Sequence, residues 1–295
     1  MSEIRRVGVI GGGLMGSGIV QVAAVGGYST VCREIGNLQC ERAHSAVRRS
    51  LDKAVEKGKL TAEARDAALG RMSFVTDLGS PAGADLVIEA IVEDLAEKKA
   101  LWSTLDLLSP AKTLFASNTS SLSIAAQAAA TARRDRFVGM HFFSPVPAMP
   151  LVEVVRTVTT SDETYRTAHE FVRRIGKIGI DTRDAPGFVV NRLLVPFMLD
   201  AIRAFEQGTG SVRDIDVGMT LGAGHPIGPL ALCDFVGLDT LQRVAESMYE
   251  EYRETRFAPP PLLKRMVVSG LLGRKSGVGF YRYGGEEPVP NTFMG

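Results

Sequence analysis

A histidine and a glutamate twelve residues apart, His141 and Glu153, are the side chains of this sequence best suited to moving a proton. His141 lies in the apolar stretch 136–143, and Glu153 interrupts the apolar run 151–155. Imidazole titrates near neutral pH, and a carboxylate in an apolar run is costly to bury without a partner. We therefore predict that Glu153 pairs with His141, fixes its tautomer and stabilises the imidazolium. The alternative is that Glu153 faces water on an edge strand.

A second polar cluster, SNTSS at 117–121, directly follows the apolar stretch TLFA. Ligands of open α/β sheets bind beyond the carboxyl ends of the strands, so hydroxyl and amide groups there are candidate contacts. Capping of the following helix is the alternative; it fits Ser121 best and leaves Ser120 only partly explained. We expect Ser120 to belong to a functional site.

Glycines at Gly11, Gly13 and Gly16, in VGVIGGGLMGSGIV, have the G-x-G-x-x-G spacing of a phosphate-binding turn. The spacing alone is a weak signal in a chain with 31 glycines. The context is stronger, because a strand-like run at 7–10 precedes the glycines and a helix-like pattern at 14–25 follows them. In such a unit Gly11 permits the tight turn, Gly13 lets backbone N–H groups approach a pyrophosphate, and Gly16 lets the helix pack on the strand.

An acid at the end of the next strand-like stretch, YSTVC, bears on the choice between the nicotinamide cofactors. Glu34 lies eighteen residues after Gly16, where a carboxylate can bond the adenine ribose hydroxyls. Since Glu34 would repel a ribose 2′-phosphate, the sequence favours NAD; Arg33 beside it leaves NADP as the alternative. A proton-accepting pair such as His141 and Glu153 fits hydride transfer from an alcohol to that cofactor.

Composition excludes several function classes. The 295 residues are 45% hydrophobic and 23% charged, with a formal net charge of +1 and no basic run that would indicate nucleic-acid binding. Three scattered cysteines form no C-x-x-C pair, which indicates reduced thiols and no metal site. No apolar run approaches the ~18 residues that cross a bilayer. We expect a cytoplasmic protein with a small-molecule ligand and with no metal, nucleic-acid or membrane partner.

Strand-like and helix-like stretches alternate over most of residues 1–186, which predicts an α/β domain with a Rossmann-like, doubly wound, mostly parallel sheet. After DAPGF, at 184–188, strand signals vanish, so we predict a C-terminal all-helical domain at 187–295. Besides the opening unit, strands are expected at 73–76, 84–91, 113–118, 136–143, 151–157 and 177–183, and helices at 39–57, 62–69, 93–108, 122–129, 163–175, 189–206, 238–252 and 261–268.

Seven stretches, in order and with consistent spacing, make the chain resemble the L-3-hydroxyacyl-CoA dehydrogenases of the 3-hydroxybutyryl-CoA dehydrogenase type. They are GGGLMGSGI, VIEAIVED, ASNTSSL, GMHFFSPVPAMPLVEVV, PGFVVNRLL, GHPIGPLALCDFVGLD and LGRKSGVGFY. The resemblance covers nearly the whole length and implies an NAD-dependent oxidoreductase that interconverts (3S)-3-hydroxyacyl and 3-oxoacyl thioesters of coenzyme A. It also implies that the helical domain forms a homodimer and that the site lies between the two domains.

The resemblance implies roles for single residues. His141 would be the acid–base group and Glu153 its orienting partner, while Ser120 and Asn191 would bond the substrate oxygen. On sequence alone Asn191 could instead cap a helix after PGF, and Glu93, Lys98 and Lys275 could be surface charges. The cofactor contacts expected from the turn or the resemblance are Gly11, Gly13, Leu14, Met15, Gly16, Glu34, Glu93, Lys98, Ser120, Ser144 and Lys275, and the coenzyme A contacts are Ser50 and Lys57.

Two positions depart from the family's pattern. Ser144 stands where asparagine is usual, near the nicotinamide and substrate, and Pro150 stands where lysine is frequent. Serine offers one hydroxyl in place of an amide that both donates and accepts. These changes leave the acyl chain and its carrier open, so a relative acting on a carrier-protein thioester is an alternative. A catalytically idle NAD-binding structural protein is another, against which the joint presence of His141, Glu153, Ser120 and Asn191 argues.

Overall fold

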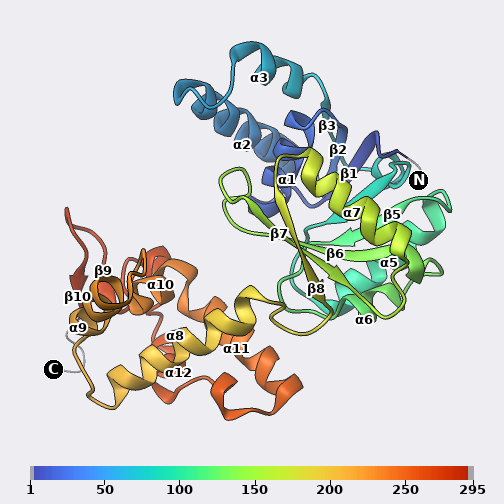
Figure 1. Cartoon of the computed structure of the whole chain (residues 1–295). Helices are drawn as coiled ribbons and strands as arrows, with labels where there is room; N and C mark the ends of the chain where they lie inside the picture. Colours follow the sequence, from blue (N-terminus) through green and yellow to red (C-terminus); the bar gives the residue numbers. More distant parts are fainter. Residues whose placement is uncertain (1–2, 292–295) are drawn as a thin grey trace. The chain divides into compact units, whose positions relative to one another are not determined.

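The structure, a computed structural model, describes residues 3–291, and the chain divides into two compact units, 1–188 and 189–295 (Figure 1). The first unit is an α/β unit built on one large sheet, and the second is mainly helical. Within residues 3–291, none of the helices combines the length and the apolar character that crossing a bilayer requires. Across the same range no cluster of histidine, cysteine, aspartate and glutamate side chains is placed to hold a metal ion.

The sheet of the first unit has eight strands in the order β3-β2-β1-β4-β5-β6-β7-β8. Strands β1 to β6 are parallel, β7 runs antiparallel to β6, and β8 is parallel to β7. This confirms the predicted α/β class with a doubly wound, mostly parallel sheet, whose strand order reverses between β1 and β4. The strands are β1 (Arg6–Ile10), β2 (Ser29–Arg33), β3 (Met72–Val75), β4 (Leu86–Glu89), β5 (Leu114–Ser117), β6 (Phe137–Phe142), β7 (Leu151–Arg156) and β8 (Ile178–Arg183).

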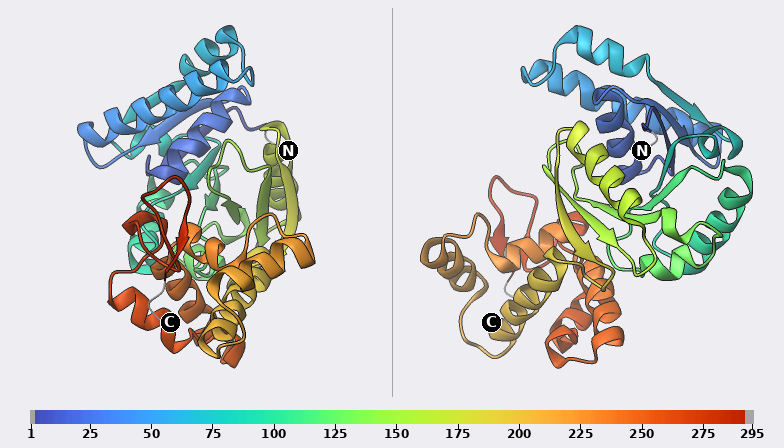
Figure 2. Two further views of the ribbon diagram at one scale, coloured as in Figure 1. Left: turned by 90° about the vertical axis from the view of Figure 1, so that its left-hand side faces the viewer. Right: turned by 45° about the vertical axis from the view of Figure 1, so that its right-hand side comes forward.

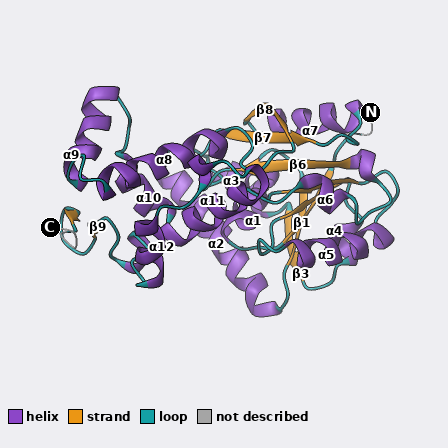
Figure 3. Ribbon diagram, turned by 90° about the horizontal axis from the view of Figure 1, so that it is seen from below, coloured by secondary structure: helices purple, strands orange, loops and turns teal. Residues whose placement is uncertain are grey.

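Helices cover both faces of this sheet, and each face has its own apolar core (Figures 2 and 3). Successive residues of a strand point to opposite faces, so Leu86 and Ile88 of β4 join one core and Val87 joins the other. This two-sided burial accounts for the apolar runs of the central strands. One face carries α1 (Leu14–Val25), α2 (Asn37–Glu56), α3 (Ala62–Leu69) and α7 (Asp162–Arg174), and the other carries α4 (Gly79–Ala82), α5 (Leu95–Leu108) and α6 (Ile124–Ala128).

The second unit packs its helices around a separate core. Buried residues of α8, α10, α11 and α12 form that core together with Val212 of α9, Phe257 and Phe280. The helices are α8 (Val190–Glu206), α9 (Val212–Val217), η2 (Gly218–Gly222), α10 (Pro229–Val236), α11 (Leu238–Tyr252), η3 (Thr255–Phe257), α12 (Pro261–Val268) and η4 (Arg274–Ser276).

The prediction that strands end at DAPGF is wrong in one detail. A short antiparallel pair, β9 (Tyr281–Arg282) and β10 (Val289–Pro290), follows the last helix. Each strand has two residues, which is too short for an alternating apolar pattern to be visible in the sequence. The first strand is held by side-chain oxygens of Asp234, a residue far away in the chain, which accept hydrogen bonds from the backbone N–H groups of Phe280 and Tyr281.

Candidate active site

The β6–β7 pair places His141 and Glu153 directly opposite each other. They are register partners in the antiparallel ladder, so their side chains lie on the same face of the sheet. The distance from His141 Nδ1 to Glu153 Oε2 is 2.6 Å. Glu153 is fully buried, because β7 lies inside the sheet between β6 and β8, and the alternative that it faces water on an edge strand is wrong. The carboxylate can accept a hydrogen bond from Nδ1–H, which leaves Nε2 as the nitrogen for acid–base chemistry.

Aromatic rings surround the His141 imidazole. Its ring centroid lies 4.5 Å from that of Phe143 and 5.7 Å from that of Phe188, and only 7% of the residue is exposed. Phe188 ends the DAPGF stretch, which Asp184 anchors by accepting hydrogen bonds from Ser123 Oγ and from the backbone N–H groups that begin α6. This arrangement keeps most water away from the imidazole.

The turn between β1 and α1 has the steric features of an anion-binding turn. Gly11 has a φ of +93°, and its N–H donates to Arg33 O at 2.9 Å. A Cβ on Gly16 would lie 1.7 Å from Gly11 O, so only glycine allows the helix to start this close to the strand. A Cβ on Gly13 would meet nothing within 4 Å, so the N-terminus of α1 opens toward free space there. The unpaired N–H groups of that helix end suit a pyrophosphate, and these residues therefore fit NAD.

Glu34 lies against this turn. Its Oε1 accepts a hydrogen bond from Gly12 N at 2.6 Å, and its Oε2 accepts one from Ile35 N at 3.1 Å. The side chain is half-buried, and carboxylate oxygens can accept more than one bond each. Glu34 is thus held beside the turn with acceptor capacity left for a ligand hydroxyl.

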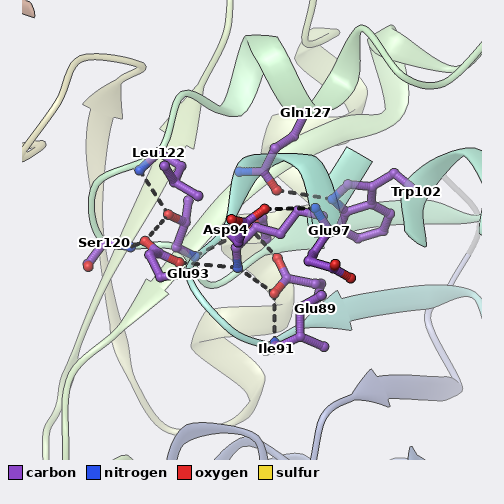
Figure 4. Close-up of polar contacts among 12 residues, drawn as sticks. Glu89, Ile91, Glu93, Asp94, Glu97, Trp102, Ser120, Leu122 and Gln127 are labelled. Carbon is purple, nitrogen blue, oxygen red and sulfur yellow. Dashed lines mark hydrogen bonds and ion pairs between the residues drawn. The ribbon is translucent and has the colours of Figure 1, made fainter. Parts of the chain in front are cut away.

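A buried ion pair lies at the carboxyl ends of β4 and β5 (Figure 4). Lys98 Nζ of α5 is 2.5 Å from Glu89 Oε1 of β4, and the two residues are 1% and 0% exposed. Glu89 also accepts hydrogen bonds from Ile91 N at 2.7 Å and from Ser117 Oγ at 2.6 Å. The sequence reasoning did not select Glu89. The signal was an acid inside the apolar stretch VIEAI, the same feature that drew attention to Glu153.

Glu93 connects this ion pair to the turn at 119–121. It accepts hydrogen bonds from Thr119 Oγ1, from Ser120 N at 3.1 Å and from Ser121 Oγ at 3.2 Å, and its other oxygen lies 3.2 Å from Lys98 Nζ. Burial alone would raise the pKa of Glu93, but the Lys98 charge and these hydrogen bonds outweigh it and hold the pKa below its usual value. Glu93 is therefore an ionised acceptor around which the turn folds.

The capping explanation offered for Ser121 is wrong, because its hydroxyl bonds Glu93. The N-cap of α6 is Ser123, whose Oγ accepts a hydrogen bond from Ala126 N. The neighbouring Asn118 has a different role that the sequence did not specify: its Oδ1 accepts a hydrogen bond from Phe142 N at 3.0 Å. It thereby ties the end of β5 to the end of β6, next to His141.

Comparisons with known proteins bear directly on this arrangement. Residues 6–185 match the family described as 3-hydroxyacyl-CoA dehydrogenase, NAD binding domain, and residues 187–283 match 3-hydroxyacyl-CoA dehydrogenase, C-terminal domain. The chain belongs to the 3-hydroxyacyl-CoA dehydrogenase family. It is an NAD-dependent oxidoreductase, as the sequence predicted.

Individual relatives of this dehydrogenase are similar over nearly their whole length. A 3-hydroxybutyryl-CoA dehydrogenase of Mycobacterium tuberculosis is 46% identical over 282 residues, 95% of this chain and 99% of the relative. The mitochondrial hydroxyacyl-coenzyme A dehydrogenase of Sus scrofa is 43% identical, over 95% of this chain and 91% of the relative. The crystal structure of (S)-3-hydroxybutyryl-CoA dehydrogenase from Ralstonia eutropha matches with a TM-score of 0.93 and 42% identity, covering 96% of this chain and all of that one.

The other expected site residues of the dehydrogenase are spread over both units. In the first, Ser144 is exposed in the loop after β6, and Ser50 and Lys57 lie seven residues apart on α2 and at its C-cap. Seven residues are about two helical turns, so both face the same side of that helix. Leu14, the first residue of α1, is 76% exposed, and Met15 packs partly against the core.

Two expected site residues, Asn191 and Lys275, belong to the second unit. Asn191 is the second residue of α8, whose N-cap is Val189, so the explanation of Asn191 as a helix cap is wrong. Lys275 is half-exposed and forms an ion pair with Asp239.

Proposed function

We propose that this dehydrogenase interconverts (3S)-3-hydroxyacyl-CoA and 3-oxoacyl-CoA, with 3-hydroxybutyryl-CoA and acetoacetyl-CoA as its substrate pair. The observation that carries the proposal is the 2.6 Å contact between His141 Nδ1 and Glu153 Oε2 in the sheet that also bears the glycine turn. The names of the similar dehydrogenases, several of them 3-hydroxybutyryl-CoA dehydrogenases, support the thioester substrate.

His141 is the proton acceptor in the direction of oxidation. Its Nδ1–H donates to Glu153, so Nε2 takes the proton of the 3-hydroxyl group as the O–H bond breaks and the C=O bond forms. NAD⁺, held at the glycine turn, would supply the acceptor for the hydride that leaves the carbon bearing this oxygen. The Glu153 carboxylate stabilises the positive charge that the imidazole acquires. In the direction of reduction the imidazolium returns the proton to the 3-oxygen.

The remaining site residues bind the cofactor and the substrate and orient them. The glycine turn would hold the pyrophosphate and Glu34 the adenine ribose, while Ser120 and Asn191 would bond the substrate oxygen. Ser50 and Lys57 would contact the coenzyme A moiety. Together with Glu34, the proposed cofactor contacts are Gly11, Gly13, Leu14, Met15, Gly16, Glu93, Lys98, Ser120, Ser144 and Lys275.

We further propose that residues 1–186 form the NAD-binding domain and that 187–295 form a helical domain for substrate binding and dimerisation. Large apolar side chains left exposed in the second unit support a homodimer, among them Leu193 at 71%, Leu221 at 83% and Phe235 at 56%. A monomer in light scattering at micromolar concentration would contradict it. The fact that Cys32, Cys40 and Cys233 are all free thiols supports a reducing, cytoplasmic location, which fractionation of expressing cells would check.

The experiment that tests the proposed reaction is NADH oxidation with acetoacetyl-CoA, compared with the same acyl group on an acyl carrier protein. We expect turnover with the coenzyme A thioester and a lower kcat/KM with the carrier-bound one. Faster turnover of the carrier-bound substrate would instead assign a biosynthetic role. If neither substrate supported NADH oxidation, the proposed function would be refuted.

A further inference from the structure

We propose that Lys177 is a positioning residue that holds the loop between β6 and β7, and with it Ser144, in the arrangement that receives the nicotinamide end of NAD. The loop, residues 143–150, joins the strand that bears His141 to the strand that bears Glu153. The inference rests on the proposed function insofar as Ser144 is taken as a cofactor contact.

The loop has few hydrogen-bond donors of its own. Its sequence, FSPVPAMP, contains three prolines, which have no backbone N–H. The N–H groups of Ala148 and Met149 both donate to Pro145 O, at 2.9 and 3.1 Å. Val146 is 1% exposed, whereas the loop residues on either side of it are exposed. The loop therefore depends on groups outside it to fix its remaining carbonyls.

Lys177 supplies such a donor group. Its Nζ donates to Val146 O and to Met149 O, each at 2.6 Å. One ammonium group thus bridges two carbonyls that lie three residues apart in the loop. The next backbone N–H, that of Ile178, donates to Pro150 O at 2.8 Å and ties the end of the loop to the start of β8.

The burial of Lys177 indicates that these two bonds are the reason for a lysine at this position. The residue is 8% exposed, and in the described part of the chain the acceptors of Nζ are the two loop carbonyls, both neutral. Removing an ammonium group from water is costly unless hydrogen bonds replace those lost, and burial accordingly lowers the pKa of Lys177. An apolar side chain of similar volume would fill the space without this cost, but it could not hold the loop.

The backbone of Lys177 is fixed independently of the loop, because α7 ends in a Schellman motif. Gly176 has a φ of +74°, and its N–H donates to Arg173 O at 3.1 Å. The N–H of Lys177 donates to Val172 O, also at 3.1 Å. Val172 and Phe171 are buried in the core on this face of the sheet. The lysine is therefore presented to the loop from a rigid helix end.

The helix that follows the glycine turn packs against the same loop. A Cβ on Gly18 of α1 would lie 2.7 Å from Val146 Cβ, so only glycine allows this approach without a shift. The Val146 side chain joins the core on the face that α1 covers. The loop is thus held by α1 and by Lys177, with Ser144 two residues before Val146. Without the lysine Ser144 could move, while the β6–β7 ladder that pairs the acid–base residues would stay intact.

The test compares the affinities for NADH and for ADP-ribose, which lacks the nicotinamide, by titration calorimetry without any thioester. We expect Lys177→Met to bind NADH about tenfold more weakly, because a loop that adopts its binding arrangement about a tenth of the time lowers the apparent affinity by that factor. ADP-ribose should bind as it does to the wild type, because the glycine turn and Glu34 are unchanged. Lys112→Met is the matched control; this lysine is exposed before the start of β5, at the opposite edge of the sheet, and both affinities should stay the same.

A double variant tests whether Lys177 acts through Ser144. Ser144→Ala should also weaken NADH binding selectively, and Lys177→Met combined with it should bind NADH no more weakly than the weaker single variant, because both changes remove the same contact. Fully additive losses, or an unchanged NADH affinity in either single variant, would overturn the proposal. Equal losses for NADH and ADP-ribose in Lys177→Met would also overturn it, because they would indicate a general disturbance of the domain.

Melting curves without cofactor identify a variant that fails to fold. Lys177→Gln then carries the test: its amide keeps N–H donors on a side chain one atom shorter, which cannot place a nitrogen where Nζ lies, and the same selective loss for NADH is expected. Since no measurement here uses a thioester, a wild type that binds NADH but does not oxidise it with acetoacetyl-CoA would refute the proposed function, whereas an unselective loss in the Lys177 variants would refute only this inference.

Discussion

Each unit of the molecule buries carboxylates, but their partners differ. In the first unit Glu153 faces an imidazole and Glu89 faces an ammonium group. In the second unit the donors to Asp234 and Asp216 among the described residues are neutral, namely backbone N–H groups and tyrosine hydroxyls. A carboxylate beside a titratable cation can assist a proton transfer or respond to a ligand, whereas one held by neutral donors serves as a structural joint.

The hydrogen bonds of Asp234 explain the motif LGRKSGVGFY in the second unit. Asp234 accepts hydrogen bonds from Phe280 N at 2.9 Å, Tyr281 N at 2.8 Å and Tyr283 OH at 2.9 Å. A Cβ on Gly273 would lie 2.4 Å from Asp234 O, and one on Gly279 would lie 2.0 Å from Asp234 Oδ1. The glycines are therefore required for the closing segment to fold around the aspartate. A stretch that marks a family can reflect architecture as well as chemistry.

The largest effect should come from the pair that includes the imidazole. His141→Gln removes the proton acceptor, so kcat should fall on the order of 10² to 10⁴ while much of the NADH affinity is kept. Steady-state kinetics with acetoacetyl-CoA and calorimetry with NADH measure the two quantities. Near-normal turnover would mean that the base lies elsewhere in the chain.

Glu153→Gln should give a related, somewhat smaller loss in kcat, on the order of 10², because it removes the charge that stabilises the imidazolium but keeps a hydrogen-bonding group. The double variant tests whether the residues act as a unit. If they do, its kcat is close to that of His141→Gln, and a much slower double variant would show that they act independently.

Replacing Asp234, which is held by neutral donors, should lower the stability of the protein without changing its catalytic rate. Asp234→Asn places an amide N–H₂ against backbone donors, and we expect a loss of about 1–3 kcal/mol in the free energy of unfolding with kcat nearly unchanged. Asp200→Asn is the matched control, because Asp200 is exposed and makes only a surface ion pair with Arg203; its effect should stay below about 0.5 kcal/mol. Equal melting temperatures for Asp234→Asn and Asp200→Asn would show that the buried Asp234 carboxylate contributes no more to stability than the exposed Asp200 carboxylate.

Glu34 tests an intermediate case, since backbone N–H groups hold it as they hold Asp234, yet it is half-exposed beside the glycine turn. NAD(H) should bind at least about tenfold more tightly than NADP(H), because a carboxylate repels a 2′-phosphate at contact distance. Glu34→Gln should narrow that ratio. Equal affinities of the wild type for NAD(H) and NADP(H), or a preference for NADP(H), would contradict the assignment of Glu34 as the residue that selects NAD(H).

The smallest effect concerns pH. Burial, the largest influence, raises the pKa of Asp234, so its stabilising contribution is full below the unfolded pKa of about 4 and is lost as pH rises through the folded value. The pKa of Glu93 is lowered, so its contribution is present above about 4.3 and is lost as pH falls through the folded value. The difference in unfolding free energy between wild type and Asp234→Asn should therefore fall as pH rises above about 4, whereas the difference between wild type and Glu93→Gln should fall as pH drops below about 4.3. If both differences changed in the same direction with pH, the contrast between Asp234 and Glu93 would be wrong.

Local features of the sequence were enough to predict the α/β class, the glycine turn and the family. They depend on short-range rules: alternation along a strand, apolar spacing along a helix, and the steric freedom of Gly11 and Gly16. The pairing of His141 with Glu153 was also accessible, because a buried carboxylate requires a partner and the candidates were few. The same rule pointed to Glu89 and was not applied there.

What only the tertiary structure decided are the contacts between residues far apart in the chain. The direction of β7 sets His141 opposite Glu153, and the meeting of β4, α5 and β5 gives Glu89 its partners. Ser123 caps α6 while Ser121 bonds Glu93, and Asp234 holds a segment 46 residues away. A side chain's type limits which bonds it can form. Its choice among them is decided by which groups the packed chain brings within about 3 Å, and by the cost of leaving any buried polar group unbonded.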